Sequence, residues 1–197
     1  MSQDRLNTIA SHQEILHFPK GGTPSLAPNK WLVWSGSQDE GGLPVLDHVA
    51  HKVLVPFAWW LNHMHSHHHE ADIQSKAKAG QIGVWFAADD DILKHADVIE
   101  SGKKVWPLVA AHFPIFRDGR SFSTAALLRD RFAWTGEIRA IGDVLIDQLL
   151  QGARVGFDSF ALRPDQNLDV ALKQFDLYSV TTQNSWRGKR TFIAETV

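Results

Sequence analysis

The chain contains no cysteine among its 197 residues. Without thiols it can form no disulfide, use no thiol nucleophile and carry no persulfide. Iron–sulfur clusters and zinc sites that depend on cysteine ligands are excluded as well. Several redox and metal chemistries are therefore closed to this chain on its own.

An excess of charge of one sign and a long apolar run are also missing. Twenty Lys and Arg against 22 Asp and Glu give a net charge of −2, whereas a general nucleic-acid binder needs a marked basic excess. The longest apolar run, Val53 to Leu61, has nine residues, far fewer than the roughly 20 that span a bilayer. No apolar segment typical of a secretion signal follows Asp4 and Arg5, so we expect a cytoplasmic protein without nucleic-acid or membrane partners.

The common nucleotide and hydrolase motifs are absent too. The sequence has no GxGxxG after a candidate strand, no P-loop, no GxSxG and no HExxH. A Rossmann-type nicotinamide enzyme is therefore not supported. Whether the chain is an enzyme stays open, and no cofactor is indicated.

The first 80 residues form an irregular, Trp- and Pro/Gly-rich segment. Helix- and strand-breaking residues such as Gly21-Gly22 and Pro44 separate short apolar segments. This pattern favours short strands and loops. The polar, His-rich stretch 62–80 is expected to be an exposed linker. Eight tryptophans, including Trp59-Trp60, indicate that some are partly exposed or lie against a partner, which suggests a homo-oligomer or a partner contact.

Residues 81–197 read as an α/β domain. Apolar, β-prone runs at 82–87, 105–113, 137–142 and 158–162 alternate with segments that have helical spacing and caps. Strand–helix alternation with short links predicts right-handed βαβ units and a parallel sheet. The sheet could be an open three-layer arrangement or a partial barrel, and the sequence does not separate the two.

The loop Phe116–Ser123 is the most informative candidate site. In a parallel sheet the loops that leave the carboxyl ends of the strands share one edge, where ligands bind. This loop offers Arg120, hydroxyl groups and a helix start, and such groups hold oxyanions. The competing interpretation is structural: Asp118-Gly119 is an ordinary turn, Ser121 or Ser123 an ordinary helix cap, and Arg120 can pair with Asp118 or Asp143.

Residues 82–158 resemble a bacterial family of unknown function whose members are often labelled as oxidoreductases of sulfite reduction. The motifs that carry the resemblance are Phe113-Pro114, Phe116, Asp118-Gly119-Arg120, Ser123, Leu128-Arg129, Gly136-Glu137, Arg139-Ala140, Gly142, Val144, Asp147-Gln148, Arg154 and Gly156-Phe157-Asp158. Two positions depart from the family pattern: Phe122 replaces a common Tyr, and His112 stands where an acidic residue is more usual.

The resemblance implies a role in assimilatory sulfite reduction, and hence in sulfur assimilation. Our first hypothesis is an accessory protein that binds an oxyanion or docks on a sulfite-reductase component. The alternative is an enzyme with an oxyanion substrate held at the loop Asp118–Ser123.

The polar residues of this pattern divide into two groups. We expect Asp118, Arg120, Ser123 and Asp143 to bind the ligand, with Arg139 supporting them from its strand, where it could reach Asp147. Buried charges must be paired. A structural network of arginines and aspartates therefore explains the second group equally well, namely Arg129, Arg139, Arg154 and Asp147.

Histidines supply a third, more distant hypothesis. His63, His65 and His67 alternate along one segment and would point the same way if it were extended, so they could hold Zn²⁺ or Ni²⁺. A solvated linker that binds metal adventitiously is the competing interpretation, and we assign no metal site. His112, near the strand-end edge, is either a general base or a hydrogen-bonded structural residue.

Overall fold

A computed structural model describes residues 9–36, 43, 52–64, 70–178 and 183–188. The strands join in one eight-stranded sheet with the order β2-β1-β8-β7-β6-β5-β4-β3. Strands β3 to β8 run parallel to one another, and β1 is antiparallel to both β8 and β2. The strands are β1 (Glu14–His17), β2 (Ser25–Pro28), β3 (Trp31–Val33), β4 (Lys52–Pro56), β5 (Ile82–Phe86), β6 (Leu108–Phe113), β7 (Glu137–Gly142) and β8 (Ser159–Phe160).

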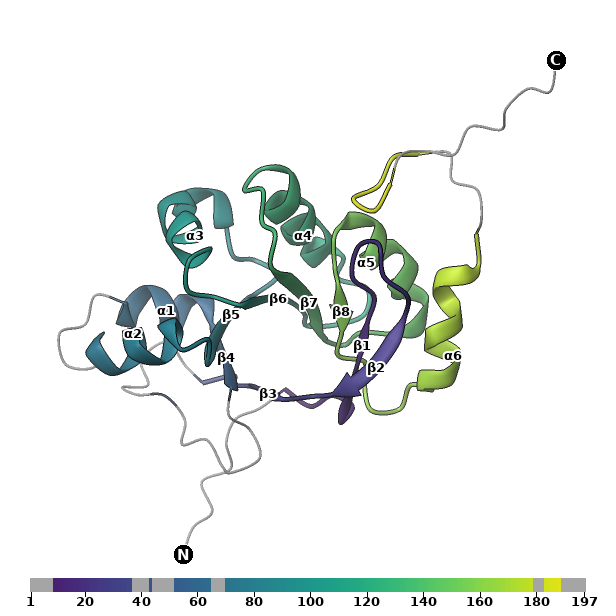
Figure 1. Cartoon of the computed structure of the whole chain (residues 1–197), viewed down its shortest axis with the longest axis horizontal. Helices are drawn as coiled ribbons and strands as arrows, with labels where there is room; N and C mark the ends of the chain where they lie inside the picture. Colours follow the sequence, from purple (N-terminus) through teal and green to yellow (C-terminus); the bar gives the residue numbers. More distant parts are fainter. Residues whose placement is uncertain (1–8, 37–42, 44–51, 65–69, 179–182, 189–197) are drawn as a thin grey trace, which may run out of the picture.

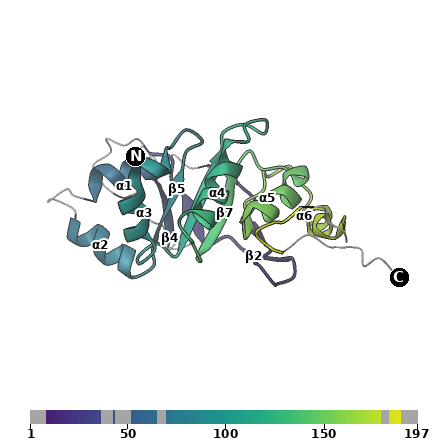
Figure 2. The ribbon, with the colours of Figure 1, turned by 90° about the horizontal axis from the view of Figure 1, so that it is seen from above.

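Helices connect the parallel strands and lie outside the curve of the sheet (Figure 1). Figure 2 shows them following one another along the molecule, from α1 and α2 at one end to α6 at the other. The helices are α1 (Phe57–His63), α2 (Glu70–Lys78), α3 (Ala96–Gly102), α4 (Arg120–Asp130), α5 (Leu149–Val155) and α6 (Leu168–Leu172), with short 3₁₀ turns η1 (Ile92–His95), η2 (Ile146–Gln148) and η3 (Lys173–Asp176). The predicted α/β class with parallel βαβ units is therefore confirmed.

The sheet is curled into a half-barrel, the second of the two predicted arrangements. Its edge strands β2 and β3 are joined by only Asn29 and Lys30, so the two edges of the sheet must approach each other at this corner. Residues 9–13 cross between the two sides: Ile9 N–H donates to Val33 O (3.0 Å), and His12 N–H donates to Leu162 O (3.0 Å). Strands from both parts of the sequence, 1–80 and 81–197, belong to this one sheet.

Both faces of the sheet are packed with apolar side chains. Along β7, Ile138 and Ala140 pack with the main core that contacts the helices, whereas Ile141 belongs to a smaller cluster on the concave face. This alternation follows from the two-residue repeat of a strand. The smaller cluster consists of Ile15, Val33, Leu54, Leu108, Ala110, Ile141 and Ala161.

One expectation about the N-terminal part is wrong. The stretch 62–80 is not all linker, because Glu70–Lys78 forms α2, and its Ile73 and Ala77, one helical turn apart, are buried in the core. Trp31 is partly exposed, as expected for some of the tryptophans. Trp59 and Trp60 on α1 are core residues, 0% and 3% exposed, and are therefore unavailable to a partner.

A buried arginine ties the start of β7 to the segment before β8. Arg129 on α4 donates to Trp134 O (2.6 Å), Gly136 O (2.9 Å) and Gly156 O, and it pairs with Asp158. Its side chain is 2% exposed. The predicted structural use of Arg129 is observed, because its charge and donors are all compensated.

The longest helix in the described ranges, α4, has 11 residues. None of the helices in these ranges combines the length and apolar character needed to cross a membrane.

Candidate functional site

The loop between β6 and α4 lies at the edge of the sheet where the parallel strands end. Its Asp118 and Arg120 form a two-pronged ion pair, with Nε–Oδ1 at 3.0 Å and Nη2–Oδ2 at 2.7 Å. The hydrogen bonds from Arg120 lower the pKa of Asp118 to about 2. The guanidinium is 59% exposed, so this pair orders the loop and remains open to solvent.

Asp143, directly after β7, joins three strand-end segments. Its Oδ2 accepts the backbone N–H of Phe116 (2.7 Å), and its Oδ1 accepts Nη1 of Arg163 (2.7 Å), which follows β8. Its own N–H donates to Phe113 O (2.8 Å). Both carboxylate oxygens are therefore occupied by the protein itself.

The backbone of Phe116 is fixed on both sides. Asp143 accepts its N–H, and Nε2 of Gln148 donates to its carbonyl at 3.0 Å. Oε1 of the same Gln148 accepts the N–H of Leu145 (2.9 Å). The backbone of the loop is consequently held in a defined conformation at Phe116.

This fixed loop exposes large apolar side chains. Ile115 is 44% and Phe116 40% exposed, and Leu93, in the turn after the neighbouring strand β5, is 50% exposed. We call Ile115 and Phe116 the apolar rim. Sequence reasoning concentrated on the charged part of the loop and missed this feature, although an Ile-Phe pair between a strand and a turn was a usable signal.

Ser123 and Arg139 lie apart from this loop. Ser123 is exposed on α4, which is capped by Gly119 without a side-chain bond. Neither Ser121 nor Ser123 caps the helix, because Ser121 instead donates to His112 O (2.6 Å). The predicted site residues Asp118, Arg120 and Asp143 thus share one edge, with Ser123 on the following helix.

Arg139 does not reach Asp147. Its strand directs it to the concave face, where Nη2 contacts Oε1 of Glu137 (2.7 Å) and Nε contacts Oγ of Ser159 (3.1 Å). Arg139 and Ser159 are register partners on adjacent strands, and this pairing explains the difference from the expectation.

His112 lies near the same edge, on the concave side of β6. Its ring meets Trp85 edge-on at 5.2 Å, and burial lowers its pKa. Within the described residues its ring forms no hydrogen bond, so the structural interpretation of a hydrogen-bonded histidine has no support in this part of the chain.

The histidine run falls mostly outside the described residues. His63 stacks on Trp59 with ring centroids 4.3 Å apart, and its Nδ1 contacts Trp59 O (2.8 Å). His65, His67 and the two histidines after them are not described. Among the residues that are, no group of three His, Asp or Glu side chains could hold a metal ion.

The fold and this edge define an α/β half-barrel protein with an ordered strand-end loop that exposes charged and apolar side chains. Residues 83–193, more than half of the chain, match the family described as bacterial protein of unknown function (DUF934). The chain belongs to this family. The comparisons with curated proteins and with solved structures found no match.

Proposed function

We propose that this protein is an accessory protein of assimilatory sulfite reduction, acting in the cytoplasm, which docks on a sulfite-reductase component through the apolar rim. The connection to sulfite rests on the family resemblance of residues 82–158. We favour docking over catalysis because of the side chains at the carboxyl ends of the parallel strands. One observation carries it: the backbone of Phe116 is held from both sides while its ring and the aliphatic side chain of its neighbour Ile115 remain exposed.

Preorganised apolar side chains are typical of binding hot spots. Residues that already have their bound conformation lose little conformational entropy on association. Aromatic residues and Arg are enriched in such hot spots, and the exposed Arg117 directly follows Phe116. Exposed apolar side chains that are rimmed by polar groups mark interaction sites.

The same edge supports the oxyanion alternative less well. Arg120 is already engaged by Asp118, and Arg163 by Asp143 and Asp165. An oxyanion would have to compete with these carboxylates for the guanidinium groups. Sulfite binding that Arg120→Ala weakens about tenfold or more would favour the alternative.

A growth assay tests the proposed role. A strain that lacks this chain should grow poorly with sulfite as sole sulfur source and normally with cysteine. The wild-type gene should restore growth on sulfite, and the double variant Ile115→Ala/Phe116→Ala should not. A matched control, Val170→Ala/Leu177→Ala, removes two other exposed apolar side chains, 46% and 58% exposed, and should restore growth fully.

Equal growth of the deletion strain on sulfite and on cysteine would contradict the role in sulfite reduction. Restoration by the double rim variant would contradict the docking site.

A further inference from the structure

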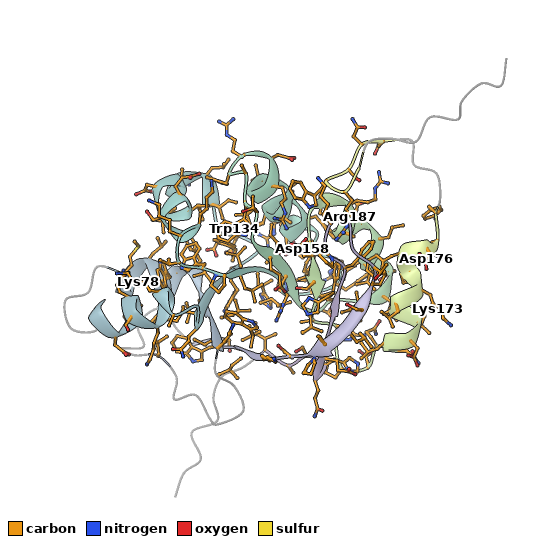
Figure 3. All side chains as sticks on the ribbon, viewed as in Figure 1. Lys78, Trp134, Asp158, Lys173, Asp176 and Arg187 are labelled. Atoms are coloured by element: carbon orange, nitrogen blue, oxygen red, sulfur yellow. The ribbon has the colours of Figure 1, made fainter. Side chains whose placement is uncertain are left out.

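A second candidate site lies at the opposite end of the parallel strands from the apolar rim, where β7 and β8 begin. A cavity of about 330 Å³ opens there, at the small end of the range for ligand pockets. Figure 3 labels Asp158, which lines the cavity, and Arg187. The cavity is lined by His17, Pro19, Lys20, Thr135, Glu137, Asp158 and Trp186.

The inner wall offers hydrogen-bond acceptors that the protein does not use. Oε1 of Glu137 accepts hydrogen bonds from Arg139 and Ser159. Oδ2 of Asp158 accepts hydrogen bonds from Arg129 and from the backbone N–H of Ile138. Within the described residues, Oε2 of Glu137 and Oδ1 of Asp158 accept no hydrogen bond. The buried arginines behind them keep both carboxylates in place.

His17 supplies a third acceptor. Burial lowers its pKa, although the nearby charges of Glu137 and Asp158 act in the opposite direction. A neutral imidazole has one acceptor nitrogen, and no described residue donates to the ring. His17, Glu137 and Asp158 all line the same cavity.

The outer wall offers donors instead. Lys20 Nζ lies 4.2 Å from the ring centroid of Trp186 and forms no ion pair with any described residue. Nε1 of Trp186 is buried without an acceptor in the described part of the chain. The cavity thus has acceptors on one side and the cationic donor Lys20 on the other.

We propose that this cavity binds a small zwitterion of the amino-acid type. The three N–H donors of the ligand's ammonium group match the three free acceptors of Glu137, Asp158 and His17. Its carboxylate accepts hydrogen bonds from Lys20 Nζ. This site is independent of the apolar rim, so either proposal can fail without the other.

Ligand-observed NMR on the full chain, first with a mixture of the common L-amino acids, tests the site. We expect at least one to bind with a Kd below about 1 mM, which corresponds to about 4 kcal/mol of binding free energy. Methylammonium and acetate, each carrying one half of the zwitterion, should bind at least tenfold more weakly. Lys20→Ala should weaken amino-acid binding about tenfold.

A matched control distinguishes the cavity from a general lysine effect. Lys52 also lies over a tryptophan, with its Nζ 5.3 Å from the ring centroid of Trp31, but it does not line the cavity. Lys52→Ala should leave the affinity unchanged. The site is overturned if no amino acid binds at millimolar concentration, if methylammonium or acetate binds as tightly as the amino acid, or if both lysine variants retain full affinity.

Discussion

At the residue scale, burial separates two arginine–aspartate pairs that look alike in sequence. The side chain of Arg129 is 2% exposed and that of its partner Asp158 14%, whereas the side chain of Arg120 is 59% exposed. Removing one member of a buried pair leaves an uncompensated charge. When one member of an exposed pair is removed, water solvates the remaining charge.

Arg129→Met should lower the free energy of unfolding by about 3–5 kcal/mol. Urea denaturation measures the effect. Arg120→Met is the control and should leave the denaturation midpoint nearly unchanged. Equal effects of the two substitutions would show that Arg129 is not the structural tie described above.

Gly142 is the residue on which the strand-end edge depends most. Its φ is +93°, and an added Cβ would lie 2.3 Å from Phe113 O and 2.6 Å from the ring of His112. Gly142→Ala should therefore cost about 2 kcal/mol or more. Gly21 has a φ of +79° and no atom within 4 Å of an added Cβ. Gly21→Ala therefore introduces backbone strain without a steric clash and should cost about 1 kcal/mol. Thermal unfolding should rank the variants in this order, and the reverse order would contradict the close contact.

Two histidines should make stability depend on pH. Burial lowers the pKa of both His17 and His112 from 6.5. Below that value the unfolded chain binds protons that the folded chain does not, so stability falls as the pH drops. Urea denaturation at pH 7.5 and 5.5 should show this loss. His112→Gln should reduce the difference between the two pH values, and an unchanged difference would contradict a buried neutral His112.

At the element scale, the half-barrel depends on the corner between β2 and β3. Asn29 Oδ1 accepts the N–H of Trp31 (3.1 Å), and Asn29 N–H donates to Gln13 O (2.7 Å). These bonds connect the corner to β3 and to the segment that crosses the open side of the sheet.

Asn29→Ala should lower the free energy of unfolding by about 1–2 kcal/mol, because the side chain loses its hydrogen bonds and Trp31 N–H loses its acceptor. Urea denaturation checks this value. The control Gln174→Ala removes an exposed amide whose one hydrogen bond to a described residue is to Val170 O (3.2 Å), and it should have little effect. A corner that tolerates Asn29→Ala as well as this control would not hold the edges together.

The regular elements of residues 81–197 were predictable because each is specified locally. The strand 137–142 matches its predicted bounds, and 82–87 ends one residue early. The run 105–113 was predicted too long, because Trp106 turns into the core and Pro107 precedes the strand. Helix α2 was missed because it buries few apolar residues within a polar, His-rich stretch.

At the scale of the whole molecule, long-range pairing could not be predicted. Nothing local to Glu14–His17 specifies that it pairs antiparallel with β8, more than 140 residues later. The same pairing brings His17 beside Ser159 and so creates the cavity. For the candidate site, the common location of Asp118, Arg120 and Asp143 at the carboxyl ends of the strands followed from parallel topology. The position of Arg139 depended instead on which of its residues β7 directs to the concave face of the sheet.

The two ends of the parallel strands present different chemistry. The edge where the parallel strands end exposes the apolar rim beside paired charges, as a protein-binding surface would. The edge where they begin encloses a small polar cavity. This division supports a protein that docks through one edge and binds a small molecule at the other.

Direct binding to purified assimilatory sulfite reductase, measured by biolayer interferometry, tests the central claim that the apolar rim docks on this enzyme. We predict saturable binding by the wild-type chain and by Val170→Ala/Leu177→Ala. Ile115→Ala/Phe116→Ala should bind at least about 30-fold more weakly, as expected for the loss of two hot-spot side chains of about 1 kcal/mol or more each. No binding by the wild-type chain, or equal affinity of the double rim variant, would contradict the account.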